Sequence, residues 1–183
     1  IGSPLLSFLL CSLCTPLQES LGWSSSFIDY GIRLFLLYLY NRPFPSIAAK
    51  SIASYIGFQD EKERKNLLKF ETDIQSECQE HKVTEFWDYF QRWKTYFPIE
   101  KTECEKYLIW AESIVYKRAD AIVSGQHRSH YGEVAGLLAV VGEIKENMGM
   151  LGAKKYIYEQ YRKKFPRHSS FQGEMRTYFN IQI

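Results

Sequence analysis

The hydrophobic pattern of this chain is helical over most of its length. Apolar side chains recur three and four positions apart from Tyr107 to Val123, and the same spacing returns from Val134 to Met148. Such spacing places them on one face of a helix with 3.6 residues per turn. Because no stretch alternates apolar and polar residues for long enough to predict a strand, we expect an all-α fold.

Helix-ending and capping residues divide this pattern into about eight or nine helices. Short connections favour antiparallel neighbours, so we expect stacked helix hairpins, like those of an α-solenoid, in one domain covering 1–183. The predicted helices span 4–14, 24–41, 46–56, 60–80, 86–97, 102–124, 134–148, 153–165 and 169–179. The predicted ends are Gly125, Gly149 and Pro166, and the predicted caps are the pairs Thr102–Glu105 and Ser169–Gln172.

Charge is spread unevenly along the 183 residues, of which 45% are apolar. A chain of this length can bury roughly 70% of its unfolded surface around one core, which excludes a disordered or collagen-like protein. Residues 1–57 carry five charged side chains and 58–183 carry the rest, in amphipathic hairpins. The low-charge segment 1–57 is either the buried side of the domain or a docking face, and burial is the favoured interpretation.

The cysteines do not form a disulfide or metal framework. Cys11, Cys14, Cys78 and Cys104 are few and irregularly spaced, so we expect a cytoplasmic protein with buried thiols. The spacing of Cys11 and Cys14 suits zinc or redox chemistry, but no second Cys or His pair accompanies it. The apolar stretch 5–13 is shorter than the roughly 20 residues of a membrane span. We expect no membrane association, no metal and no cofactor.

The densest polar segment, 124–131, lies between two predicted helices. It is an ordinary interhelix turn, an anion site at a helix N-terminus, or part of a hydrolytic site in which Asp120 or Glu133 orients a histidine. No nucleophile elbow or phosphate-binding glycine loop accompanies it, so we expect no enzyme. For a protein partner, the predicted contact residues on this edge are Arg118, His127, Arg128, His130 and Tyr131.

A basic segment follows near the end of the chain. Residues 152–183 contain seven basic and two acidic side chains, a net charge of +5. Interleaved tyrosines, Tyr156, Tyr158 and Tyr161, would add base stacking to phosphate contacts, although the same lysines also suit a solvated helix face. The predicted nucleic-acid contacts are Lys154, Lys155, Arg162, Lys163, Lys164 and Arg167.

The second half of the chain also carries a family resemblance. Leu138, Val141, Gly142 and Pro166 match the tetratricopeptide pattern, in which the glycine allows two helices to approach closely. Ala153 falls one position early in that pattern. Further segments, written in the one-letter code, are KRADAI at 117–122, YGEVA at 131–135, GEI at 142–144 and YRKKFPR at 161–167.

Together these segments resemble the C-terminal helical region of large bacterial SWIM zinc-finger proteins, over about 107–180. The zinc motif of that family, Cys-x-Cys followed by Cys-x-His, does not occur here. The resemblance implies an accessory, tetratricopeptide-like region in proteins that bind nucleic acid or protein. We therefore expect a non-catalytic protein-interaction or scaffold domain of a larger bacterial protein. The alternative is a nucleic-acid-binding accessory domain that uses the basic surface at 154–168.

Overall fold

A computed structural model describes residues 26–55, 87–88, 90–92, 94–96 and 98–180. Every regular element in these residues is a helix and none is a strand, which confirms the all-α prediction for this part of the chain. The predicted helices at 4–14 and 60–80 lie outside the described residues. The elements are α2 (Ser26–Leu39), a helix over 47–55, helical residues within 87–96, α5 (Lys101–Ser124), the short 3₁₀ helix η1 (Arg128–His130), α6 (Tyr131–Asn147), α7 (Ala153–Lys164) and α8 (Ser169–Phe179).

The predicted helix ends are confirmed. The Gly125 N–H donates to the Ala121 carbonyl at 2.9 Å and closes α5. Gly149 follows α6 with a φ of +97°, a conformation that glycine adopts without a steric penalty. Pro166 comes directly after Phe165, the residue that ends α7. Local sequence therefore sets where these three helices stop.

The two predicted N-terminal caps are wrong. α5 begins at Lys101 after Glu100, whose backbone is already extended, and no side chain caps it. α8 begins after His168, again without a side-chain cap. The Gln172 side chain instead donates to the carbonyls of Phe165 and Pro166, at 3.0 and 3.2 Å. A glutamine that satisfies carbonyls of the preceding connection is not available to form a capping box.

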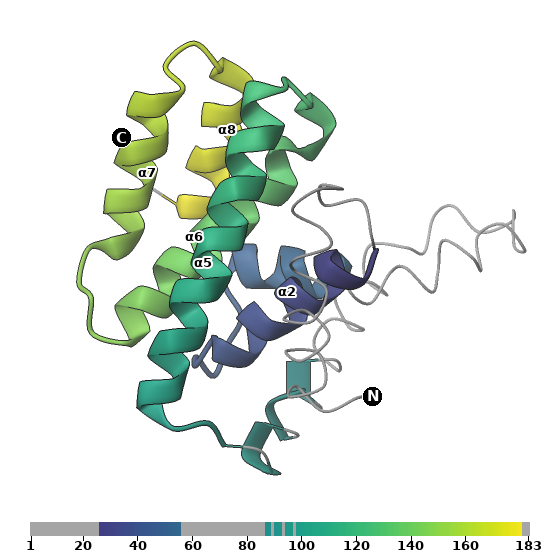
Figure 1. The fold of residues 1–183 in the computed structure, drawn as a ribbon, viewed down its shortest axis with the longest axis vertical. Coiled ribbons are helices and arrows are strands. Elements are labelled where there is room, and N and C mark those ends of the chain that lie inside the picture. The colour runs from purple at the N-terminus through teal and green to yellow at the C-terminus, as the bar shows by residue number, and fades with distance from the viewer. Residues whose placement is uncertain (1–25, 56–86, 89, 93, 97, 181–183) are drawn as a thin grey trace, which may run out of the picture.

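α6 is the centre of the helical packing. All its residues from 134 to 144 are buried, and a helix that is apolar on every side belongs in a core. It contacts α2, α5, α7 and α8. In Figure 1, α5, α6, α7 and α8 run alternately up and down, and α2 lies across them. This alternation brings the α5–α6 and α7–α8 connections to one end and the α6–α7 connection to the other.

The low-charge segment is largely buried over residues 31–40. Ile32, Leu36 and Tyr40 are fully enclosed, and α2 contacts both α5 and α6. The favoured interpretation is confirmed for 31–40 only, since Phe44 and Ile47 of the same segment are exposed.

One buried carboxylate ties three elements together. Glu143 on α6 is 1% exposed and accepts hydrogen bonds from the Ser46 hydroxyl and the Lys154 ammonium, each at 2.6 Å. Next to it, a Cβ on Gly142 would lie 2.8 Å from the Lys154 Cα. The close approach of two helices at Gly142 is thus confirmed, and the backbone of α7 occupies the space of the missing side chain.

Candidate functional site

The antiparallel helices leave two hollows, at opposite ends of the α5–α8 group. The first, here called the basic cleft, has a volume of about 270 Å³ and lies between the α5–α6 and α7–α8 connections. Its lining residues are Gln126, Arg128, Tyr131, Arg167, His168, Ser169 and Ser170. The second, here called the lysine pocket, has a volume of about 600 Å³ and is enclosed by the end of α2, residues 91–99, the start of α5 and the end of α6.

The basic cleft combines cations from two connections. Arg128 belongs to η1, and Arg167 and His168 come directly before α8. No acidic side chain lines the cleft, and neither arginine forms an ion pair with any residue that the structure describes. The first backbone N–H groups of α8 also lack helical partners, and the helix dipole makes this end positive. The cleft is therefore electropositive.

The floor of the basic cleft is rigid. Tyr131 is 3% exposed, and its ring packs edge-on against Phe171 with the centroids 5.5 Å apart. His168 packs edge-on against Phe165, and its buried Nδ1 has no hydrogen-bond partner within the described part of the chain. The packed rings thus give the cleft a well-packed floor.

The predicted partner contacts divide between this cleft and an internal ion cluster. Glu133 at the start of α6 pairs with Arg33 at 3.0 Å, with Arg118 at 3.3 Å and with His130 at 2.9 Å. Arg33 is only 2% exposed and Glu133 only 11%, so the cluster joins α2, α5 and α6 inside the fold. Arg118 and His130 are consequently held by the domain itself.

Of the other three predicted contacts, two line the cleft and one lies outside it. Arg128 and Tyr131 both line it, although the Tyr131 ring is mostly buried. His127 is exposed and folds over Gly125, outside the cleft. Arg128 was predicted as a partner contact and Arg167 as a nucleic-acid contact. Neither Ser169 nor Ser170 was predicted to bind a partner. The predicted antiparallel order of the helices already implied that the α5–α6 and α7–α8 connections lie at the same end, and this signal could have brought the two sets together.

The side chains of the basic segment 154–168 differ in how available they are to a ligand. Lys154 pairs with the buried Glu143, and Lys164 pairs with Asp120, each at 2.6 Å. The prediction that Tyr158 and Tyr161 stack on bases is wrong. Both residues lie on the buried face of α7, so their rings are unavailable to a ligand. The residues of this segment that stay exposed and chemically suited to nucleic acid are Lys155, Tyr156, Arg162, Lys163 and Arg167.

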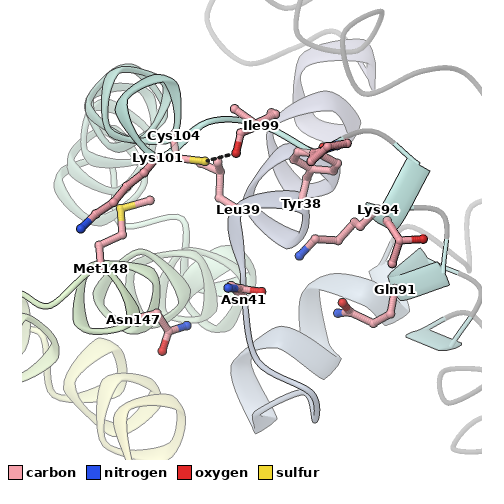
Figure 2. Close-up of a pocket in the computed structure, with 12 residues that line it drawn as sticks. Tyr38, Leu39, Asn41, Gln91, Lys94, Ile99, Lys101, Cys104, Asn147 and Met148 are labelled. Carbon is pink, nitrogen blue, oxygen red and sulfur yellow. Dashed lines mark hydrogen bonds between the residues drawn. The ribbon is translucent and has the colours of Figure 1, made fainter.

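The lysine pocket holds a partly buried amine, Lys94, which belongs to neither predicted set of contacts. Figure 2 shows the Lys94 side chain pointing into the space beside Tyr38, with Lys101 and Met148 on the opposite wall. The Lys94 ammonium donates to the Tyr40 carbonyl at 2.8 Å and lies 5.7 Å from the centre of the Tyr38 ring. Burial lowers the pKa of Lys94 to about 8. Its neighbours in sequence gave no signal, because Lys94 is one of three charged residues in the aromatic segment 86–97.

Cys104 lies on the wall of the same pocket. Its thiol donates to the Ile99 carbonyl at 3.9 Å, the contact drawn in Figure 2, and burial raises its pKa. A thiol that keeps its proton is a weak nucleophile. Cys104 is partly rather than fully buried, and the other three cysteines lie outside the described residues.

Within the described residues, the predicted hydrolytic alternative is only partly assembled. Glu133 does orient His130, as the hydrolytic alternative required, but no hydroxyl or thiol in the described part of the chain hydrogen-bonds to that ring. Asp120 pairs with Lys164 instead. No cluster of three or more His, Cys, Asp or Glu side chains in these residues is arranged to hold a metal ion. None of the described helices is both long enough and apolar enough to cross a bilayer.

No family model, no curated protein and no solved structure matches the chain. The resemblance to the helical region of SWIM zinc-finger proteins stays a prediction from the sequence segments alone. We therefore infer function from the chemistry of the basic cleft and the lysine pocket.

Proposed function

We propose that this domain is a non-catalytic protein-interaction module that binds an acidic segment of a partner protein in the basic cleft. The observation that carries the proposal is the meeting of Arg128 and Arg167, from two separate connections, in one hollow with no lining acid. Guanidinium groups bind carboxylates through paired, charge-assisted hydrogen bonds. Two acidic side chains would neutralise both arginines, and their carboxylates would accept hydrogen bonds from the first turn of α8.

The size of the basic cleft also favours a peptide side chain. Its volume of about 270 Å³ is below the roughly 300–1,000 Å³ of cofactor and small-molecule sites. One or two acidic side chains of an extended peptide fit such a space, with the backbone of the peptide running across the exposed serines at 169 and 170. The buried Tyr131 keeps the floor in place, which reduces the ordering cost of binding.

The same proposal includes a tetratricopeptide-like arrangement of the helices and a larger protein to which the module belongs. A tetratricopeptide-like stack of hairpins is supported by the α6–α7 pair and its contact at Gly142. Such a stack presents connections at one edge, where the basic cleft lies. The module would belong to a larger bacterial cytoplasmic protein, as the resemblance implies.

Nucleic-acid binding is the second candidate. Exposed Lys155, Arg162 and Lys163 on α7, with the exposed ring of Tyr156, favour contacts to phosphate and one stacked base. The partners of Lys154 and Lys164 and the burial of two tyrosines count against it.

The test compares charges inside and outside the cleft. We would measure the anisotropy of a labelled peptide rich in Asp and Glu, and of the same peptide with amides in place of acids. The double variant Arg128→Gln/Arg167→Gln should weaken acidic-peptide binding by at least about tenfold, since each charge-assisted bond contributes roughly 1.5–3 kcal/mol. The control Lys155→Gln/Lys163→Gln removes the same charge outside the cleft and should change binding by less than about twofold.

Two outcomes would contradict the proposal. Equal losses in both double variants would show that binding follows net charge, and absence of peptide binding would exclude the cleft as a peptide site. Labelled RNA and DNA at about 50 and 200 mM salt test the second candidate, because phosphate-driven affinity falls steeply with salt. In that case the Lys155/Lys163 variant loses affinity, and the cleft variant loses only the contribution of Arg167, which belongs to both sets.

A further inference from the structure

The lysine pocket contains a partly buried cation, Lys94, that has no counter-ion among the residues that the structure describes. Lys94 contacts the Tyr40 carbonyl and the Tyr38 ring, and neither an Asp nor a Glu lines the pocket. Lys94 forms no ion pair with any residue that the structure describes. A desolvated ammonium is costly unless an anion accompanies it. The pocket is therefore electrostatically complementary to a ligand with one negative charge.

A second unsatisfied donor lies beside the amine. The Gln91 Nε2 is buried and has no hydrogen-bond partner within the described part of the chain. Gln91 precedes Lys94 by three positions on the same helical segment, so the two side chains share a face. Figure 2 shows both extending toward the same space, near Asn41. An ammonium and an amide N–H that face one space offer two donors to the two oxygens of a carboxylate.

The opposite wall of the pocket is apolar apart from the exposed Lys101. Leu39, Pro98, Ile99 and Met148 line it, from three different parts of the chain. The volume of about 600 Å³ lies within the roughly 300–1,000 Å³ that small-molecule sites occupy. A flexible methionine in such a wall adapts to ligands of different shape. The pocket thus has a polar, cationic side and an apolar side.

We propose that the lysine pocket binds a small amphiphilic monocarboxylate, with its carboxylate on the Lys94 ammonium and the Gln91 amide and its apolar body against Leu39, Ile99 and Met148. This site lies at the opposite end of the α5–α8 helices from the basic cleft and is independent of the peptide-binding function. Its ligand is a medium-chain fatty acid or a compound of the same chemistry.

The proposal has a defined pH dependence. Only protonated Lys94 attracts a carboxylate, and the pKa of the unliganded amine is about 8. Affinity should therefore fall about tenfold between pH 7 and pH 9. The other titratable groups on the pocket are Tyr38, Cys104 and Lys101. Burial raises the pKa values of Tyr38 and Cys104, so both stay largely neutral over this range.

Decanoate, 1-decanol and decylamine are suitable probes, because they share one apolar chain and differ in charge. Binding to the full chain can be followed by calorimetry and by the fluorescence of the tryptophans. Decanoate should bind at least about tenfold more tightly than decanol, and decylamine more weakly than either. Lys94→Gln should abolish the preference for decanoate over decanol. The matched control Lys101→Gln removes an amine from the opposite wall and should retain it.

Equal affinities of the unaltered protein for decanoate and decanol, or no binding of either, would overturn the proposal. Loss of the preference for decanoate in Lys101→Gln would also overturn it.

A second measurement covers the case in which Lys94→Gln does not fold. Lysine acetylation of the unaltered protein, followed peptide by peptide with mass spectrometry, should label Lys94, and decanoate should protect it several-fold while Lys155 stays unprotected. Labelling of Lys94 that decanoate does not change would place the ligand elsewhere.

Discussion

Replacing Glu133 with alanine is expected to destabilise the fold severely, because it leaves two cations without their shared carboxylate. Arg33 is 2% exposed and lies 3.0 Å from Glu133, and Arg118 is 16% exposed at 3.3 Å. Removing one partner of a buried ion pair typically costs 3–5 kcal/mol, so we expect a loss of about 4 kcal/mol. His130 is half-exposed and should contribute less than about 1 kcal/mol of this loss.

The assay is chemical denaturation at pH 7, with the thermal midpoint as a second readout. A loss of about 4 kcal/mol lowers the midpoint of a domain of this size by roughly 10 °C. Glu159→Ala is the matched control, since Glu159 is an exposed carboxylate on α7 with no ion pair to any described residue, and it should change stability by less than about 0.5 kcal/mol.

A rescue variant separates charge from packing. Arg33→Met/Glu133→Leu removes the most buried pair together and should recover much of the lost stability, because apolar replacements of buried pairs are often neutral. The reasoning is refuted if Glu133→Ala costs less than about 1 kcal/mol. It is also refuted if the double variant is less stable than the single one.

Two further effects on stability follow from the packing of α6 and from the buried amine. Gly142→Ala should cost about 1–3 kcal/mol, because the new methyl group meets the Lys154 backbone at 2.8 Å, whereas Gly136→Ala, with its nearest contacts at 3.8 Å, should be neutral or slightly stabilising in the same thermal melts. Lys94 has a folded pKa of about 8, below the roughly 10.4 of an unfolded lysine, so the unfolded state binds more protons between these values and stability should rise with pH there. Compared with Lys94→Met, the unaltered protein should gain up to about 3 kcal/mol between pH 8 and 10.5 in denaturant titrations, and parallel profiles would contradict the burial of the amine.

The helices and their ends were predictable because their causes are local. Apolar spacing predicted α5 to α8, although α6 begins at Tyr131, three residues before the predicted start, and Gly125, Gly149 and Pro166 end helices where expected. The close packing at Gly142 was also predictable, because glycine is the only residue that allows such an approach. The predictions of the helix caps were wrong because a side chain that could cap a helix can also bond to other groups. The Gln172 side chain, for example, donates to a carbonyl that precedes α8.

The sites depended on contacts between residues far apart in the chain. Nothing near Lys94 in sequence shows that it lies under Tyr38 with a carbonyl of residue 40 as its partner. The rotation of α7 about its own axis decided that Tyr158 and Tyr161 are buried while Tyr156 is exposed.

The sequence by itself determined the all-α character, the helix ends and the apolar faces, because helix periodicity and chain-breaking residues act between neighbours. Only the tertiary structure decided that Glu133 neutralises Arg33 and Arg118, and that Arg128 and Arg167 line one cleft. Ion pairs, burial and pKa shifts depend on distances of a few ångströms between helices, and these are set when the faces of several helices pack together.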